Sequence, residues 1–418
     1  MEKIAADLLL KGLAPEGFAD SQPIGLVTTD SREVCPGCIF VAFPGERFDG
    51  HDFAAKALEE GAAYVVLNHP GEGVPAERAV ISPDSYHAMM VMGANYRSQF
   101  HPKVVGVTGS VGKTTTREMV AAALSAKYKT FKTPANHNSQ IGVPLTISEI
   151  SENDEIGVLE LGMSEPGEMA VIAEIAAVDS AVMTNIGVTH IENLGSRENI
   201  LKEKLHIQDG MKAGGILFVN GDNDMLSTVH AKAGCHTVRY GLGADNDYRA
   251  EDLSYLDGFP SFTMVHGEVR VPVKLTVMGE HNVMNALAAL AVADAYDVPL
   301  ADAAEKLLEF GGFKNRQQIY HKNGYTIVDD TYNASPDSMK AAIGVLSSLP
   351  AGRRIAVLAD MKELGENTIQ FHREVGAFLA EKPVDILVVY GELAQAIAEG
   401  AKKVKPDLHV VSFEEDEK

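Results

Sequence analysis

The sequence contains few cysteines, which excludes a disulfide framework. Its 418 residues include only Cys35, Cys38 and Cys235, too few for a set of bridges. Cys35 and Cys38 form a single C-x-x-C motif around a Pro-Gly pair. Since a zinc site of this kind needs a second pair of ligands and a Pro-Gly pair is typical of a turn, we interpret the motif as structural.

Long apolar runs are also missing. None approaches the roughly 18 residues of a transmembrane helix, and the start, Met1-Glu-Lys-Ile-Ala-Ala6, lacks the apolar core of a signal peptide. We therefore expect a cytoplasmic protein that does not insert into membranes.

Basic residues are outnumbered: 36 Lys and Arg against 58 Asp and Glu give a formal net charge of −22. A protein of this charge repels nucleic acid and anionic membranes unless the charge is reversed locally. We therefore expect no nucleic-acid partner. Anionic substrates would need a basic pocket, backbone amides or bound cations.

The chain is long enough for two or three domains, and its 45% hydrophobic residues allow a sizeable core. From about residue 100, short apolar runs alternate with glycine-rich turns and helical stretches. This order favours a mostly parallel sheet covered by helices. The strand candidates of this region are Val104–Val107, Ile156–Leu161, Ala181–Ile186 and Gly215–Val219.

A second α/β set follows Phe310-Gly-Gly-Phe313, and the first 100 residues have a shorter rhythm of their own. The predicted strands of these two regions are Tyr325–Val328, Arg354–Leu358, Asp385–Val389 and Leu408–Val411, and Ile39–Phe43 and Tyr64–Leu67. A helix is predicted over Met339–Leu349. We therefore predict three α/β domains, at residues 1–100, 101–312 and 313–418.

The strongest local signal is a phosphate-binding loop (P-loop) that follows a predicted strand and opens a helix. It reads Gly106-Val-Thr108-Gly109-Ser110-Val-Gly112-Lys113-Thr114-Thr115-Thr116. In such a loop, glycines let backbone N–H groups approach phosphate oxygens, the lysine neutralises the β- and γ-phosphates, and the hydroxyl after it ligates Mg²⁺. The alternative is a glycine-rich turn without a ligand.

The form T-G-S-x-G-K-T-T, with Val107 where the common P-loop has a glycine, resembles the loop of the Mur ligases. The resemblance extends from Asp30 to about residue 391. Its other motifs are Thr29-Asp30-Ser31-Arg32, Phe43–His51 and Asp329-Asp330-Thr-Tyr332-Asn333-Ala-Ser335-Pro336, in which Ser335 replaces the usual asparagine. It implies a small N-terminal domain for a UDP-sugar precursor, a central P-loop ATPase-like domain with a parallel sheet and a C-terminal Rossmann-like domain.

Within that family, the motifs are similar to those of ligases that add D-alanyl-D-alanine. The resemblance implies an ATP-dependent amide ligase that joins D-alanyl-D-alanine to the terminal carboxylate of UDP-N-acetylmuramoyl-tripeptide through an acyl phosphate. This step belongs to peptidoglycan precursor synthesis. We expect a monomer that uses ATP and two Mg²⁺ ions. The ATP-binding residues implied in the loop are Thr108, Gly109, Ser110, Gly112, Lys113, Thr114 and Thr115.

Metal and catalytic residues are expected at the carboxyl ends of the strands, where ligands of parallel sheets gather. Glu160 ends one predicted strand and His190 follows another; for His190 alone, a structural role is the alternative. The resemblance assigns Thr114, Glu160 and His190 to magnesium, although imidazole is an unusual ligand for that ion. It also aligns Lys204 with a family lysine whose carbamate ligates the second magnesium. Together with Lys113, Glu160, His190 and Lys204 form the implied catalytic set.

Further nucleotide contacts are implied at the start of a strongly helical stretch and beyond a hinge near Phe310–Phe313. Asn282 and Asn285 lie three residues apart, hence on one helix face; the alternative for Asn282 is a helix N-cap. In the family both face the nucleotide, and Arg316 and Asp330 reach it from the C-terminal domain.

The substrate-binding residues implied by the resemblance come from three regions. They are Asp30, Ser31, Arg32, Asp49, Asn136, Asn138, Tyr332 and Asn333. For the segment that holds Asn136 and Asn138, the alternative is a polar loop without a ligand.

Three other functions are compatible with the P-loop. A folylpolyglutamate synthetase shares the loop and the chemistry, but lacks an N-terminal domain with motifs like Asp30-Ser31-Arg32. A Mur ligase that adds the third amino acid would carry D-N-P-R, which this sequence lacks. From a different class, a non-catalytic nucleotide switch would hydrolyse ATP without precursor or dipeptide. The family normally continues past this chain's end with a further strand and a basic K-G-S-R stretch, and nothing like them follows Tyr390-Gly391. We therefore expect a truncated or divergent C-terminus.

Overall fold

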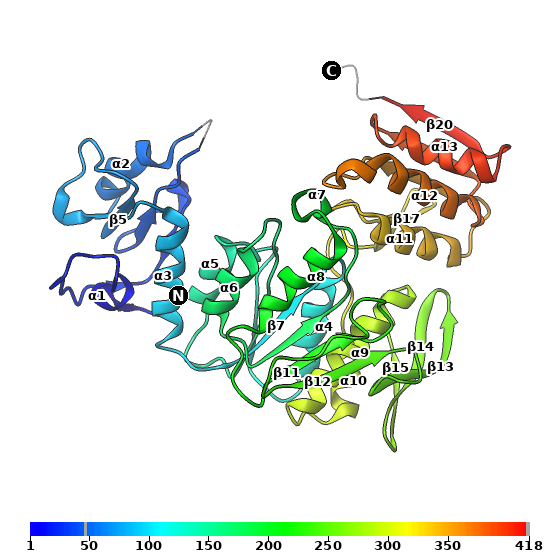
Figure 1. The fold of residues 1–418 in the computed structure, drawn as a ribbon, viewed down its shortest axis with the longest axis horizontal. Coiled ribbons are helices and arrows are strands. Elements are labelled where there is room, and N and C mark those ends of the chain that lie inside the picture. The colour runs from blue at the N-terminus through cyan, green and yellow to red at the C-terminus, as the bar shows by residue number, and fades with distance from the viewer. Residues whose placement is uncertain (46–47, 415–418) are drawn as a thin grey trace.

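The computed structural model describes residues 1–45 and 48–414. The chain forms three parts, with the N-terminal and C-terminal parts on opposite sides of the central one (Figure 1). The predicted class, a three-part α/β protein with a mostly parallel central sheet, is confirmed. The predicted domain limits stay predictions. Two residues of the Phe43–His51 motif, Glu46 and Arg47, lie outside the described residues.

The N-terminal part contains a four-stranded parallel sheet in the order β3-β4-β5-β6. Both strands predicted in this region are present, as β4 and β5. The elements are β1 (Ile4–Ala5), α1 (Ala6–Leu9), β2 (Pro23–Ile24), β3 (Val27–Thr28), β4 (Ile39–Val41), α2 (Ala54–Glu59), β5 (Tyr64–Leu67), β6 (Ala79–Ile81) and α3 (Ser85–Arg97), with short 3-10 turns at Ser31–Glu33 (η1), Gly50–Phe53 (η2) and Ala76–Arg78 (η3).

The central part contains a nine-stranded sheet in the order β15-β14-β13-β12-β11-β10-β7-β9-β8. The strands from β8 to β13 in this order are parallel, and β14 and β15 add antiparallel hairpins at one edge. The strands are β7 (Lys103–Thr108), β8 (Thr130–Lys132), β9 (Ile156–Glu160), β10 (Ser180–Met183), β11 (Ile216–Asn220), β12 (His236–Gly241), β13 (Tyr248–Leu256), β14 (Phe259–His266) and β15 (Val269–Lys274).

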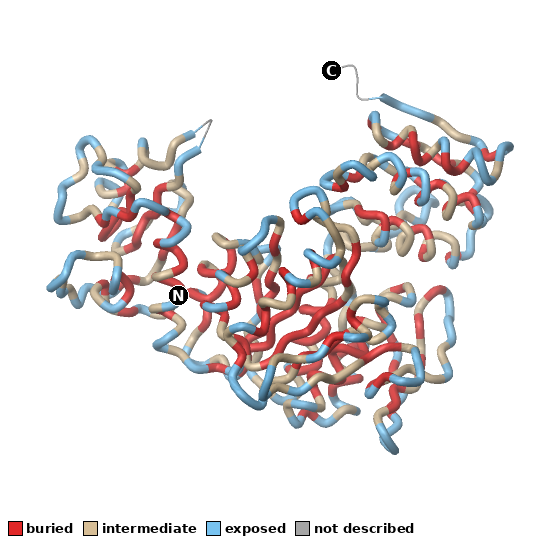
Figure 2. The backbone as a smooth tube through the Cα atoms, in the orientation of Figure 1, coloured by how far each residue is buried: buried red, intermediate tan, exposed pale blue. Residues whose placement is uncertain are grey.

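Helices cover both faces of this sheet, so its strands are among the most buried segments (Figure 2). Val104 packs into the layer that holds α6 and α8, whereas its neighbour Val105 packs into the layer of α4 and α9. This alternation explains why the strands read as continuous apolar runs. The helices are α4 (Lys113–Leu124), α5 (Gly142–Ser148), α6 (Glu168–Ala176), α7 (Ile191–Leu194), α8 (Arg197–Leu205), α9 (Glu280–Ala295) and α10 (Leu300–Leu308), with a 3-10 turn at His206–Gln208 (η4).

The C-terminal part contains the parallel sheet β18-β19-β20. Its remaining predicted strand, at Tyr325–Val328, does not join this sheet but pairs antiparallel with β16. The reason is local: Asn323 and Gly324 both have positive φ and close a two-residue hairpin turn. The elements are β16 (Gln318–Lys322), β17 (Tyr325–Asp329), α11 (Pro336–Ser348), β18 (Ile355–Ala359), α12 (Thr368–Ala380), β19 (Ile386–Tyr390), α13 (Gln395–Val404) and β20 (His409–Phe413), with a 3-10 turn at Gly365–Asn367 (η5).

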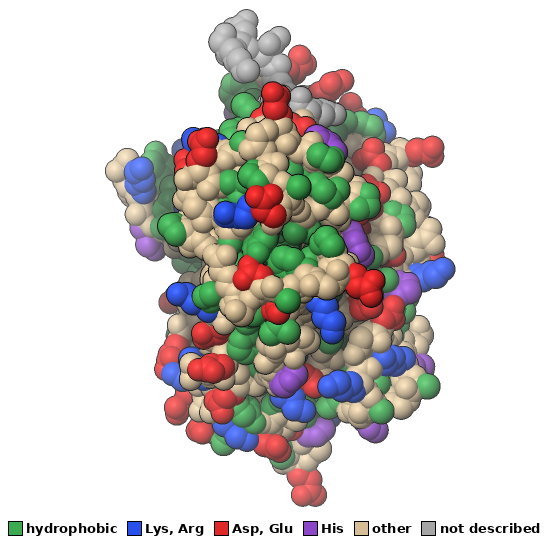
Figure 3. Space-filling view, turned by 90° about the vertical axis from the view of Figure 1, so that its left-hand side faces the viewer, with side chains coloured by type: hydrophobic (Ala, Val, Ile, Leu, Met, Phe, Trp, Pro, Cys, Tyr) green, Lys and Arg blue, Asp and Glu red, His purple; other side chains and the backbone are tan. Residues whose placement is uncertain are grey.

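Three features of this fold bear on the composition of the chain: its helices, its surface charges and its cysteines. No helix in residues 1–45 and 48–414 has the length and apolarity needed to span a membrane. On the face shown in Figure 3, acidic and basic side chains are interspersed. The three cysteines are free thiols; Cys38 is buried, and Cys35 and Cys235 are partly exposed.

Candidate active site

A cavity of about 730 Å³ lies between the central sheet and the C-terminal part. The loop before α4, residues after β9 and β10 and the start of α9 line it on the central side. The linker after α10 and residues after β17 line it on the other side. The predicted site residues that line it are Ser110, Gly112, Lys113, Thr114, Thr115, Asn138, Glu160, His190, Asn282, Asn285, Arg316, Asp330, Tyr332 and Asn333. The fold thus brings together residues that are far apart in the chain.

The P-loop connects β7 to α4 and is held by the end of β10. Gly112 has φ of +86° and precedes the helix, and a Cβ on Gly109 would lie 1.9 Å from the hydroxyl of Thr184. Only glycine fits either position. Asn185 accepts a hydrogen bond from the Val111 N–H at 2.8 Å. Backbone N–H groups at the start of α4 are therefore presented to the cavity, as an anion site requires.

Lys113 lies in the first turn of α4. Its Nζ donates to the carbonyls of Gly109 at 2.9 Å and Ser110 at 3.4 Å. Burial lowers the pKa of Lys113, and the nearby Glu160 opposes that shift. Because both hydrogen-bond partners are neutral carbonyls, the ammonium charge can act on an anion in the cavity.

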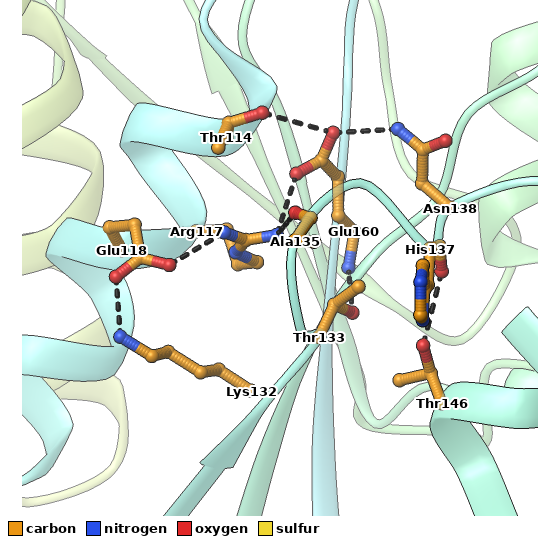
Figure 4. A network of polar contacts seen from close by, with 10 residues as sticks. All are labelled: Thr114, Arg117, Glu118, Lys132, Thr133, Ala135, His137, Asn138, Thr146 and Glu160. Atoms are coloured by element: carbon orange, nitrogen blue, oxygen red, sulfur yellow. Dashed lines mark hydrogen bonds and ion pairs between the residues drawn. The ribbon is translucent and has the colours of Figure 1, made fainter. Parts of the chain in front are cut away.

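Glu160 ends β9, is 1% exposed and is held from several sides (Figure 4). Its Oε1 accepts hydrogen bonds from Asn138 Nδ2 at 2.7 Å and from Thr114 Oγ1 at 3.3 Å. Its Oε2 accepts from Arg117 Nη1 at 3.1 Å. Nucleotide-bound Mg²⁺ is typically held by one or two carboxylates, a hydroxyl and the phosphates. The pair formed by Thr114 and Glu160 fits that donor set.

His190 lines the same cavity but is engaged elsewhere. It has φ of +62°, and its Nδ1 forms a close polar contact with the carboxylate of Glu363 in the C-terminal part. Burial lowers the pKa of His190, while Glu363 and Lys113 act in opposite directions. In the described part of the chain, no three His, Cys, Asp or Glu side chains are grouped to hold a metal. The structure therefore does not gather an all-protein metal cage around Glu160.

Lys204 does not line the cavity; it lies on α8, and its residue is 1% exposed. Burial lowers the pKa of Lys204 well below its ordinary value, repulsion from Lys113 adds to this shift, and Glu203 opposes it. Its surroundings therefore favour the neutral amine over the ammonium form.

Asn282 and Asn285 project from the first turns of α9 and are both buried. Asn282 is not an N-cap, since Gly279 holds that position; its Nδ2 donates to the Met278 carbonyl at 2.7 Å. Asn285 accepts a hydrogen bond from Thr116 Oγ1 at 2.9 Å, which ties α9 to α4.

From the C-terminal side, Arg316 stacks over the ring of Tyr332, with its guanidinium carbon 3.8 Å from the ring centre. Burial lowers the pKa of Arg316. Burial raises the pKa of Asp330, although Gln317 donates to that carboxylate. A cationic group and a carboxyl thus face the P-loop across the cavity.

The predicted substrate residues of the N-terminal part lie away from this cavity. Asp30 binds Arg32, with Oδ1 to Nε at 2.9 Å, and this hydrogen bond lowers the pKa of Asp30 to about 2; Ser31 begins the turn between them. Asp49 accepts from the backbone N–H and the ring of His51.

Three other predicted residues also lie outside the cavity lining. Asn136 is exposed, Thr108 is the last residue of β7, and Gly109 follows it in the P-loop without lining the cavity. Thr108 is fully buried.

Sequence reasoning missed Arg117, Thr184 and Asn185. Arg117 is 0% exposed and pairs with Glu160. A charge four residues after Lys113, on the apolar face of a helix, was the available signal. Thr184 and Asn185 follow β10 directly, where polar side chains of a parallel sheet are expected to face a ligand.

Comparison with known proteins agrees with this architecture. Three family models match: the Mur ligase family catalytic domain at residues 23–129, the Mur ligase middle domain at 107–293 and the Mur ligase glutamate ligase domain at 315–418. The UDP-N-acetylmuramoyl-tripeptide--D-alanyl-D-alanine ligase of Bacillus subtilis is 39% identical over 401 residues, covering 94% of this chain and 86% of that protein. The Escherichia coli ligase of the same name is 34% identical over 375 residues, covering 89% and 82%.

The chain belongs to the Mur ligase family. The resemblance expected from the sequence motifs is confirmed. A crystal structure of MurF from Acinetobacter baumannii superposes on this Mur ligase with a TM-score of 0.89 and 32% identity, covering 99% of this chain and 90% of that one. MurF of Thermotoga maritima, solved in complex with ADP, gives a TM-score of 0.81 and 32% identity, covering 93% of each. A folylpolyglutamate synthase of Mycobacterium tuberculosis, 16% identical with a TM-score of 0.63, shares the fold only.

Proposed function

We propose that this Mur ligase joins D-alanyl-D-alanine to the terminal carboxylate of UDP-N-acetylmuramoyl-tripeptide at the expense of ATP. The observation that carries the proposal is the cavity in which Lys113 and the P-loop amides face the carboxylate of Glu160. The names of relatives that align over most of their length support this choice of substrates.

Formation of an amide from a carboxylate needs a better leaving group than oxide. In the proposed mechanism, the precursor carboxylate attacks the γ-phosphorus of ATP, ADP leaves, and an acyl phosphate forms. Lys113 and the amides of residues 110–115 stabilise charge on the phosphoryl oxygens. The dipeptide amine then attacks the acyl carbon, and the tetrahedral intermediate collapses to amide and phosphate.

Magnesium would be held by Glu160 and the Thr114 hydroxyl, whose contact at 3.3 Å provides an anionic and a neutral oxygen side by side. When bound, the ion would neutralise phosphate charge. His190 is a candidate second-site ligand through the ring nitrogen that does not face Glu363. We assign Lys204 as a carbamate, because a neutral amine is the form that reacts with carbon dioxide and burial favours that form.

The adenine side of the nucleotide is assigned to Asn282 and Asn285, and its phosphates and ribose to Arg316 and Asp330. The UDP-sugar is assigned to the motifs at residues 30–32 and 49, its muramoyl region to Asn136 and Asn138, and the peptide side to Tyr332 and Asn333. The three domains at residues 1–100, 101–312 and 313–418 would thus each bind one part of the reactants. We expect the reaction to be cytoplasmic and the protein monomeric.

The test is phosphate release from Mg-ATP with UDP-N-acetylmuramoyl-tripeptide, with and without D-alanyl-D-alanine. The proposal predicts release only with all components, together with the pentapeptide product by mass spectrometry. Release that ignores the dipeptide would instead favour an ATPase switch, and product formation with glutamate and a folate would favour the folylpolyglutamate alternative.

A further inference from the structure

Arg117 is a charged residue in the core whose role the proposed mechanism leaves open. It lies on α4, one turn after Lys113, and is 0% exposed. An arginine cannot lose its charge in a protein, and burial of a charge is unfavourable unless partners surround it. The identity of these partners therefore indicates what the side chain holds in place.

The guanidinium group bridges two carboxylates and a loop (Figure 4). Nη1 donates to Glu160 Oε2 at 3.1 Å and to the Ala135 carbonyl at 2.8 Å, and Nη2 donates to Glu118 Oε1 at 2.6 Å. The other oxygen of Glu118 binds Lys132. Two cations and two anions thus form one network with no net charge.

This arrangement divides the two oxygens of Glu160 between different tasks. Oε2 is occupied by Arg117, whereas Oε1 meets Thr114 and Asn138 at the cavity. Arg117 also holds the carbonyl of Ala135, in the loop that carries Asn138. Loss of its forked contacts would let the Glu160 carboxylate turn and would loosen that loop.

We propose that Arg117 is a positioning residue that fixes Glu160 with one oxygen toward the cavity, and so sets the affinity of the divalent-ion site. This inference rests on the proposed function only in taking Glu160 as a metal ligand. Arg117 itself does not line the cavity. Lysine at this position would keep the charge but could not span Glu118, Glu160 and Ala135 at once.

The experiment measures Mn²⁺ binding to the full chain in the presence of ADP by calorimetry, together with the apparent KM for Mg²⁺ and kcat in phosphate release. Partners that orient a metal ligand typically affect metal affinity about 10- to 100-fold. Arg117→Met should weaken Mn²⁺ binding within that range, and Arg117→Lys should weaken it by about tenfold. Both should raise the KM for Mg²⁺ more than they lower kcat.

The matched control is Arg97→Met, which removes a half-buried arginine bound to the carbonyls of Phe100 and Pro102 at the other end of the sheet. It should lower the melting temperature and leave Mn²⁺ affinity unchanged. Wild-type Mn²⁺ affinity in a folded Arg117→Lys or Arg117→Met protein would overturn the proposal, as would equal losses in Arg97→Met. Failure of the proposed function is separate: the wild type would then make no amide product, whatever its affinity for Mn²⁺.

Discussion

Lys113→Met removes the fixed positive charge of the P-loop while keeping a side chain of similar length. In the wild type, the ammonium group donates to two neutral carbonyls and faces the cavity. Deletion of one fixed donor to a developing anion typically lowers turnover about 10²- to 10³-fold, equivalent to about 2.7–4 kcal/mol. We expect a loss of that size in kcat for phosphate release.

The same substitution should have little effect on folding. Burial lowers the pKa of Lys113. At pH values between the folded and the ordinary lysine pKa, the unfolded chain therefore binds more protons than the folded one. The buried charge thus opposes folding at neutral pH. Removal of this cost offsets the loss of two hydrogen bonds, worth about 1 kcal/mol each. We therefore expect a melting temperature within about 4 °C of the wild type.

The assay combines phosphate release under saturating substrates with thermal unfolding followed by circular dichroism. Lys127→Met, which changes an exposed lysine just after α4 that contacts the carbonyl of Asp297, should match the wild type in turnover. Turnover of Lys113→Met within about threefold of the wild type would refute the reasoning, since it corresponds to less than about 0.7 kcal/mol. A parallel collapse of turnover and melting temperature would show that Lys113 is structural.

Three further predictions concern single side chains. In buffer free of carbon dioxide, where Lys204 is a bare amine, Lys204→Met should raise the melting temperature, because burial lowers the pKa of Lys204 and the unfolded chain binds more protons. The gain should be larger at pH 6 than at pH 9, and an equal gain at both would contradict this. Tyr96→Phe removes a buried hydroxyl that donates to the Ile150 carbonyl at 2.7 Å and accepts from the Glu2 N–H at 2.9 Å. This substitution should lower the free energy of unfolding, measured by urea titration, by about 1–3 kcal/mol without changing turnover. Ser335→Ala removes the capping box of α11 and should lower the free energy of unfolding by about 0.5–2 kcal/mol, measured in the same way. Ser335→Asn retains a capping oxygen and should leave that free energy unchanged.

The central strands could be predicted because both faces of the sheet are covered. Neighbours such as Val104 and Val105 enter different core layers and are both 0% exposed, so each strand reads as an unbroken apolar run. The position of Glu160 could also be predicted, from the direction of the strands. The carboxyl ends of adjacent parallel strands meet at one edge, and β9 pairs directly with β7, which leads into the P-loop.

The antiparallel hairpins were missed although the sequence carries their signal. Asp257-Gly258 joins β13 to β14, and Asn323-Gly324 joins β16 to β17; all four residues have positive φ. Asp-Gly and Asn-Gly pairs between apolar runs are strong markers of two-residue hairpins. With them, the displacement of Tyr325–Val328 from the C-terminal sheet could have been predicted.

Contacts between distant parts of the chain could not be predicted in this way. His190 pairs with Glu363, and Arg117 stacks near the ring of Phe313 in the linker, with 5.6 Å from the guanidinium carbon to the ring centre. Neither contact leaves a periodic pattern in the sequence. Each depends on how the C-terminal part docks on the central sheet.

The most direct test of the central claim follows an oxygen atom. UDP-N-acetylmuramoyl-tripeptide with heavy oxygen in its terminal carboxylate is incubated with Mg-ATP and D-alanyl-D-alanine, and the released phosphate is analysed by mass spectrometry. An acyl-phosphate mechanism transfers one labelled oxygen from the carboxylate to phosphate in every turnover. Phosphate without the label would mean that water attacks ATP, and would contradict the assignment of this cavity to amide ligation.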